Sequence, residues 1–190
     1  MNFPPGSVGE TLRLMHGVWH DHIQLYQLNG DVLEDDPWSG TPGSAPFDNL
    51  VYVDFDGESY KQTNVTFRGR PLHIRSFQGK LQDGILRFGH LGPDDPSHMG
   101  AAAGPGRIIY SPLHITPAWQ NYSEPDFIQL SGINQRTRVT LLYRHGVAVR
   151  TLLATGYKLS PDPTVRHPSD PRGPEGQVHE ALKATTVFHR

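Results

Sequence analysis

Short runs of alternating apolar and polar residues fill most of this chain, and they predict β-strands. After residue 16 the helical period is weak, and β-branched and aromatic residues gather instead in short segments. Several of these segments are separated by Asn29-Gly30, Asp56-Gly57 or Asp83-Gly84. Such dipeptides favour tight hairpins because both turn positions need positive φ. The pattern therefore predicts an antiparallel meander.

Strands are expected at residues 16–27, 49–55, 59–67, 72–80, 85–90, 107–111, 127–133, 137–144 and 147–159, with a tenth near 31–38. Open twisted sheets rarely exceed about ten strands, and closing the sheet also removes its unpaired edges. A capping box, Ser7-x-x-Glu10, predicts one short helix before the first strand. We therefore expect an all-β, up-and-down barrel of about nine to ten strands with an N-terminal helix.

The barrel domain is expected to cover residues 1–159 and a Pro-rich tail residues 160–190. Residues 160–176 are rich in Pro, Asp, Arg and Gly, which suits a linker or tail, whereas Val178, Leu182, Val187 and Phe188 could let the end dock. Pro- and Gly-rich loops interrupt the meander at 35–48, 91–106 and 112–125. Long loops are often lids or binding loops, so at least one of them is expected at the mouth.

Composition narrows the class of partner. The chain has 190 residues and a formal net charge of −2, without a run of like charges, which argues against nucleic acid. It has no cysteine, so disulfides and thiolate sites are excluded. We find no signal-peptide pattern and no apolar stretch near the roughly 18 residues of a membrane span. A cytoplasmic protein without membrane or nucleic-acid partners is expected, and a homodimer is left open.

Several motifs occur in an order that resembles an uncharacterised lipocalin-like (calycin) family over residues 14–159. They are Gly17-Val18-Trp19, Asn29-Gly30-Asp31-Val32, Tyr60-Lys61-Gln62-Thr63-Asn64, Gly84-Ile85-Leu86-Arg87-Phe88, Arg136-Thr137-Arg138 and Arg150-Thr151-Leu152-Leu153. The resemblance implies that the Trp19 indole plugs the closed end of a barrel. It also implies an arginine stacked across that indole, for which Arg150 or Arg144 is the candidate, in a cation–π contact worth about 0.5–2 kcal/mol.

His20 and His22 are the first candidates for chemistry. Residues i and i+2 of a strand share a face, and a third ligand such as His73 would complete a metal site. If Trp19 faces the lumen, alternation sends Asp21 inward and both histidines outward, unless a bulge reverses them. Three alternatives stay open: solvated histidines, a metal site and a lumenal acid or base.

Polar residues share one face of the strand at 59–67. Lys61 lies on the opposite face and is poorly suited to burial, so Tyr60, Gln62 and Asn64 are expected to face the lumen. They could orient a ligand or form an internal hydrogen-bond network. Arg138 would select an anionic or carbonyl-bearing ligand if it is lumenal, and would merely be solvated on the outer face.

These features predict a barrel that binds a small, mostly apolar molecule. The first hypothesis is a cofactor-independent isomerase or cyclase, in which Tyr60 or Asn64 polarises a carbonyl and His20 or His22 carries a proton. The predicted ligand-binding residues are Gln62, His73, Trp119 and Arg138. The alternative is a non-catalytic carrier or sensor of a lipid-like, pigment or haem ligand. No cofactor or metal is assigned, and nucleotide-binding and common hydrolase motifs are absent from the sequence.

Overall fold

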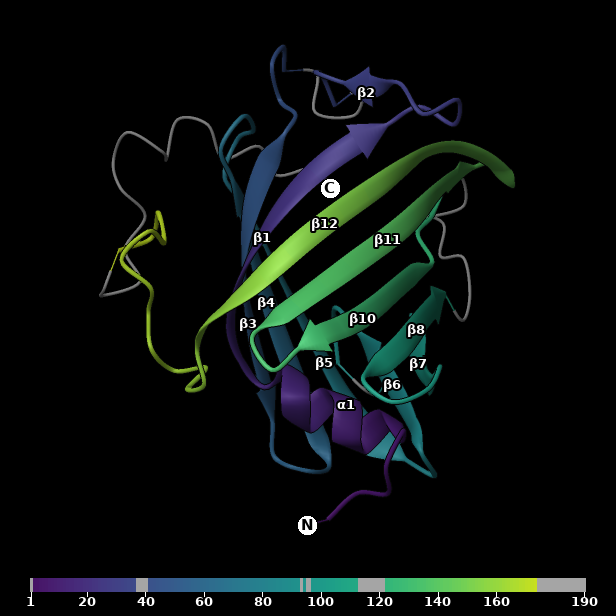
Figure 1. Cartoon of the computed structure of the whole chain (residues 1–190), viewed down its shortest axis with the longest axis vertical. Helices are drawn as coiled ribbons and strands as arrows, with labels where there is room; N and C mark the ends of the chain where they lie inside the picture. The colour runs from purple at the N-terminus through teal and green to yellow at the C-terminus, as the bar shows by residue number, and fades with distance from the viewer. Residues whose placement is uncertain (1, 37–40, 93, 95–96, 113–121, 174–190) are drawn as a thin grey trace.

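The computed structural model describes residues 2–36, 41–92, 94, 97–112 and 122–173, which form one helix and a long antiparallel sheet (Figure 1). The elements are α1 (Val8–Met15), β1 (Gly17–Tyr26), β2 (Val32–Leu33), β3 (Phe47–Phe55), β4 (Ser59–Phe67), β5 (His73–Gln82), β6 (Ile85–Gly89), β7 (His98–Ala102), β8 (Arg107–Pro112), β9 (Tyr122–Ser123), β10 (Asp126–Gly132), β11 (Gln135–Arg144) and β12 (Val147–Ser160). The one helix in the described ranges, α1, is not long and apolar enough to cross a membrane.

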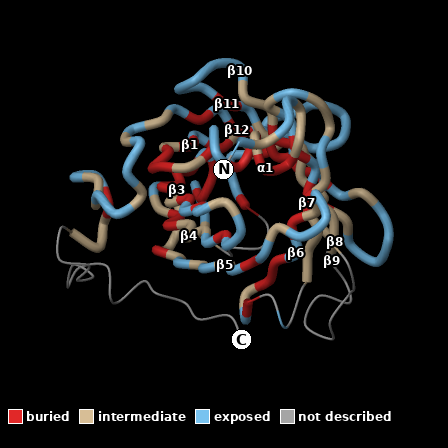
Figure 2. The backbone as a smooth tube through the Cα atoms, turned by 90° about the horizontal axis from the view of Figure 1, so that it is seen from below, coloured by how far each residue is buried: buried red, intermediate tan, exposed pale blue. Residues whose placement is uncertain are grey.

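The sheet closes into a barrel. Neighbouring strands follow the order β10-β8-β7-β6-β5-β4-β3-β1-β12-β11, and β10 also pairs with β11, which completes the ring. Figure 2 shows this ring end-on, with α1 at its centre. The short β2 and β9 pair with β1 and β11 outside the ring. The predicted all-β antiparallel barrel is therefore confirmed.

Most strand predictions agree with the structure, but β7 and the two-residue β9 lie in segments that the sequence predicts as loops. The range 59–67 coincides with β4, whereas β7 lies inside the segment 91–106 that reads as a loop. Its residues His98–Ala102 are mostly small and carry no β-branched side chain. An added Cβ at Gly100 would lie 3.0 Å from the Tyr110 ring, so a larger residue there would require the ring to shift. β-strand propensity therefore does not predict β7, because close packing against Tyr110 favours a small residue there rather than a β-branched one.

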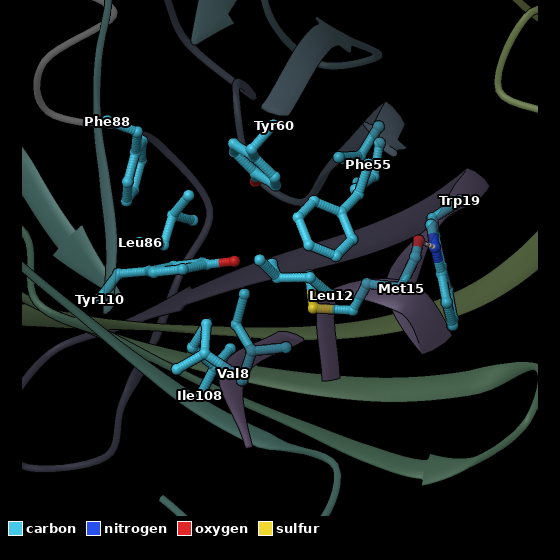
Figure 3. Close-up of a cluster of buried hydrophobic side chains, with 13 residues drawn as sticks. Val8, Leu12, Met15, Trp19, Phe55, Tyr60, Leu86, Phe88, Ile108 and Tyr110 are labelled. Atoms are coloured by element: carbon cyan, nitrogen blue, oxygen red, sulfur yellow. Dashed lines mark hydrogen bonds between the residues drawn. The ribbon is translucent and has the colours of Figure 1, made fainter. Parts of the chain in front are cut away.

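The helix α1 closes one end of the barrel. Ser7 caps it by accepting a hydrogen bond from the Glu10 amide at 3.2 Å, as the capping box predicts. Leu12 and Met15 are fully buried and pack with Trp19 inside the ring (Figure 3). This apolar plug fills the end of the barrel at which β1 begins.

The Trp19 indole is covered by cations, but not by the arginine that the resemblance suggested. Its Nε1 donates to the Met15 carbonyl at 2.6 Å, the Arg136 guanidinium lies 4.6 Å from the ring centroid, and Lys158 lies at 4.9 Å. Arg150 was the wrong candidate because Lys158 is the residue of β12 that pairs with Trp19, while Arg150 lies beyond the far end of β1. Arg144, at the end of β11, is exposed.

A second apolar cluster lies toward the opposite end of the barrel. Its buried members include Ile23, Leu25, Phe47, Leu142 and Leu152. Beyond it, the buried Asp36 carboxylate forms ion pairs with Arg70 and Arg150. The interior thus holds two apolar clusters, with inward-facing polar side chains between them and a buried ion-pair network beyond the second cluster.

Residues 161–173 lie against the outer face of β3 rather than extending from the barrel as a free linker. The Tyr52 hydroxyl donates to Asp170 at 2.6 Å, and the Asp170 side chain is completely buried. Composition predicted no apolar packing for this segment, and the observed attachment is ionic. Val178, Leu182, Val187 and Phe188 lie outside the described residues.

Candidate ligand-binding site

Three polar side chains of β4 form a row inside the barrel. Tyr60 belongs to the interior cluster drawn in Figure 3, and alternation places Gln62 and Asn64 on the same face. The Tyr60 hydroxyl donates to Gln62 Oε1, and Gln62 Nε2 donates to Asn64 Oδ1 at 2.8 Å. Gln62 and Asn64 face inward but keep partial solvent accessibility. Water can therefore reach this level of the interior.

Arg138 of β11 also faces inward. It pairs with Ile128 on one side and Ala154 on the other, and both neighbours are buried on the inner face of the sheet. Its Nε is buried and has no hydrogen-bond partner among the described residues. A buried donor without a partner costs about 1–3 kcal/mol, so this group is suited to receive an acceptor from a ligand.

Two carboxylates lie near this arginine. Asp126 of β10 accepts a hydrogen bond from the Thr140 hydroxyl, and Glu124 precedes it by two residues. Burial raises the pKa of the Glu124 carboxyl, although the positive charges of Arg75 and Arg138 oppose part of this effect. The raised pKa makes Glu124 a candidate for a group that carries a proton.

Aromatic rings cover another part of the interior. Phe88 lies at its centre, with ring centroids 5.7 Å from Tyr60, 5.1 Å from Tyr110 and 5.4 Å from His98. Burial raises the pKa of Tyr110 to about 12 and the pKa of Tyr60 well above its usual value, so both phenols stay protonated. These rings offer an apolar surface together with hydroxyl groups.

Histidines border the same surface. The His90 ring lies 4.4 Å from that of Phe77, and burial lowers the pKa of His90, with Arg75 and His98 adding to the shift. A neutral imidazole is therefore favoured there. The predicted ligand residue His73 pairs with the inward-facing Thr66, so it lies on the lumenal face of β5.

His20 and His22 do not join this constellation. Alternation from Trp19 is kept through β1, so both rings lie on the outer face, where they approach Asp48 at 3.6 and 2.9 Å. Burial alone would raise the pKa of Asp48, but hydrogen bonds from His22 and Arg68 outweigh it and lower the pKa. The expectation of a lumenal proton carrier at His20 or His22 is corrected, because no bulge turns these side chains inward.

The described ranges hold no group of three or more His, Cys, Asp or Glu side chains arranged to bind a metal ion. The interior therefore offers organic acid–base and hydrogen-bonding groups. Trp119, the remaining predicted ligand residue, lies outside the described residues.

Sequence reasoning missed Arg75, Glu124 and Asp126. Arg75 shared a face with His73 and Phe77, so the same alternation that located Gln62 could have found it. Glu124 had no such signal, because it belongs to the Pro-rich segment 112–125 that precedes β10. The approach of Glu124 to Arg75 and Arg138 depends on contacts between distant strands and not on local pattern.

Solved structures similar to this one include a protein from Nostoc punctiforme and one from Guillardia theta. A protein of unknown function of the DUF3598 family from Nostoc punctiforme superposes with a TM-score of 0.57 and 13% identity, covering 78% of this chain and 49% of that one. An S-type phycobiliprotein lyase from Guillardia theta superposes with a TM-score of 0.54 and 12% identity, covering 80% of this chain and 92% of that one. This chain has a lipocalin-like, calycin-type fold. The resemblance seen in the sequence is thus confirmed at the level of the fold.

The lipocalin-like chain spans about half the length of the Nostoc protein. No family model matches it, and no curated protein matches it. At these identities the structural likeness establishes architecture alone. Arguments about function therefore rest on the lumenal residues.

Proposed function

We propose that this protein binds a small organic molecule in the barrel lumen, with an anionic or carbonyl oxygen at Arg138 and an apolar body against the aromatic rings. The observation that carries the proposal is the buried, unpartnered Nε of Arg138. Guanidinium groups recognise carboxylates and other oxyanions through paired hydrogen bonds. Gln62 and Asn64 offer further polar contacts on the opposite wall.

The position of the polar groups supports binding rather than a purely structural role. A barrel interior that only stabilises the fold can be filled with apolar side chains, as at the two ends of this one. Here the intervening level carries polar groups with partial solvent accessibility, at Gln62, Asn64, Glu124 and Arg138. Ligand pockets commonly combine an apolar lining with a few convergent polar groups.

A matched pair of fluorescent probes tests the proposal in solution. Anilinonaphthalene sulfonate carries an anionic group on an aromatic body, and N-phenylnaphthylamine is its neutral counterpart. We expect Arg138→Gln to weaken binding of the sulfonate about tenfold or more while leaving the neutral probe nearly unchanged, since losing a charged hydrogen bond costs about 1.5–3 kcal/mol.

The control variant is Arg107→Gln, which removes an exposed charge from β8. It should leave the affinity for both probes at the wild-type value. Equal loss of sulfonate binding in the two variants would reject Arg138 as the anchor, because it would indicate a general effect of net charge.

A second candidate is a cofactor-independent isomerase or cyclase acting on the same ligand. The observation that favours it is the raised pKa of Glu124 beside a lumen that also contains the Tyr60 hydroxyl. Glu124 would move the proton, the role first expected of His20 or His22, while Tyr60 or Asn64 would polarise a carbonyl.

Recovery of a bound ligand separates carrier from enzyme. The molecule that co-purifies with the protein from its host would be extracted, re-incubated with protein in deuterated water and analysed by mass spectrometry. An enzyme incorporates deuterium or changes the isomer ratio, and Glu124→Gln abolishes this. A carrier returns the ligand unchanged.

The name of the Guillardia theta structure describes a lyase of phycobiliproteins. This supports including pigments among the ligands that are tested for the carrier alternative. A haem ligand would give the purified protein a Soret band, and its absence after incubation with haemin would remove that option.

A further inference from the structure

A pocket lies on the outside of the barrel, between β3, β4 and the segment 161–173. Its volume is about 350 Å³, and its lining includes Tyr52, Lys61, Thr63 and two arginines, Arg166 and Arg172. Lys61 and Thr63 flank Gln62 along β4, so they point away from the lumen. Figure 1 shows the segment leaving the lower end of β12 and running back along the outer side of the barrel.

One buried carboxylate holds both arginines in place. Arg172 Nε and Nη2 donate to Asp170 at 2.9 and 2.6 Å, and Arg166 Nη1 donates to it at 3.1 Å. The Tyr52 hydroxyl supplies a further hydrogen bond at 2.6 Å. Hydrogen bonds from these groups outweigh the effect of burial and lower the pKa of Asp170 to about 2. The carboxylate is therefore ionised and fully engaged.

The pocket keeps an excess of positive charge. Lys61, Arg166 and Arg172 carry three positive charges, against the two negative charges of Asp54 and Asp170. Lys61 is exposed at the pocket, and each guanidinium retains N–H groups that no residue in the described ranges accepts. Because Asp170 fixes the arginines in advance, a ligand would not have to order them.

We propose that this outer pocket is a second binding site, for a small anion carrying two or more negative charges. Planar guanidinium forks and a nearby ammonium recognise phosphate and carboxylate oxygens. The volume lies within the range of about 300–1,000 Å³ that small-molecule sites occupy. A phosphate ester and a polycarboxylate share this chemistry, so the experiment must distinguish them.

Isothermal titration of the full chain with pyrophosphate and, separately, with citrate tests the site at constant ionic strength. We expect saturable one-to-one binding of at least one of these anions. Binding of pyrophosphate would indicate a phosphate ester as the ligand, and binding of citrate would indicate a polycarboxylate. Lys61→Gln should weaken it about tenfold, which corresponds to the loss of one charged hydrogen bond of about 1.4 kcal/mol.

Arg87→Gln is the matched control because it removes an exposed charge from β6, away from this pocket. Its affinity should equal that of the wild type. Absence of saturable binding of both anions overturns the proposal, as does an equal loss in Lys61→Gln and Arg87→Gln. Arg138→Gln should leave pyrophosphate and citrate binding intact. The outer site can therefore be rejected by these titrations without affecting the proposal of a lumenal site, and the reverse also holds.

Discussion

Two inward-facing arginines of β11, Arg136 and Arg138, differ in how their guanidinium groups are hydrogen-bonded. Arg136 and Asp21 form a two-point ion pair at 3.0 and 2.7 Å between Nε and Oδ1 and between Nη2 and Oδ2, and both side chains are nearly inaccessible. Arg138, two residues further along β11, has a buried Nε without such a partner. The contrast places Arg136 in the structure of the closed end of the barrel and favours Arg138 as the residue that the proposed ligand would contact.

Asp21→Asn should therefore destabilise the fold strongly. It leaves the Arg136 guanidinium buried without a carboxylate, and breaking a buried pair in this way costs about 3–5 kcal/mol. Urea unfolding gives the free energy of unfolding directly. Asp94→Asn, at an exposed carboxylate, should change it by less than about 0.5 kcal/mol. A loss below about 1 kcal/mol in Asp21→Asn would contradict the structural role of the pair.

Acid should loosen the ionic attachment of Asp170. The native pKa of about 2 lies below the ordinary value of 3.8, so the unfolded chain binds more protons between these values. The stabilisation is present above about pH 4 and is lost as the pH falls toward 2. Asp170→Asn should flatten this part of the stability–pH curve measured by chemical unfolding. A variant curve parallel to that of the wild type would count against the contact.

At the scale of elements, strand β12 is constrained by what it approaches. A Cβ at Gly156 would lie 2.1 Å from Asp21 Oδ1 and 2.9 Å from the Arg136 side chain. At Gly132, in β10, the nearest atom would be 4.0 Å away. The glycine of β12 therefore allows the buried ion pair to lie directly against the backbone.

Gly156→Ala should cost about 1–3 kcal/mol through overpacking, whereas Gly132→Ala should be close to neutral. Thermal unfolding of both variants measures the difference. Similar midpoints for the two would show that β12 can shift away from the ion pair without cost.

The strands themselves were largely predictable because alternation is a local signal. Lys61 on one face of β4 was enough to place Tyr60, Gln62 and Asn64 on the other. Arg138 could not be placed in this way, since its neighbours Val139 and Leu141 are apolar yet 38% exposed on the outer face. In this part of β11 apolar side chains therefore face outward while the polar Arg138 faces the lumen, which is the reverse of the usual pattern.

Contacts between distant segments were not predictable from local pattern. The arginine over Trp19 is Arg136 because the register of β12 with β1 and β11 brings that side chain to the closed end. The charges of Arg75 in β5 and Arg138 in β11 act on the buried Glu124 carboxyl, although these residues are far apart in the sequence. Neither spacing nor composition carries information about such register, which the closed sheet as a whole determines.

At the scale of the whole molecule, the barrel has three levels. Apolar clusters lie at the helix-covered end, where Tyr60, Phe88 and Tyr110 belong to the cluster, and toward the opposite end, and polar side chains lie between them. Because the apolar ends stabilise the ring, the middle level can carry groups such as Arg138 and Glu124 that do not contribute to a dry core. This separation lets a single closed sheet combine a stable scaffold with a polar interior.

The most direct test of this account is a crystal structure of the protein with anilinonaphthalene sulfonate. We predict one probe molecule inside the ring, with its sulfonate within hydrogen-bond distance of Arg138 and its rings against Phe88. Density for the probe only on the outside of the barrel, or an interior filled by side chains at the level of Gln62 and Arg138, would contradict the central claim.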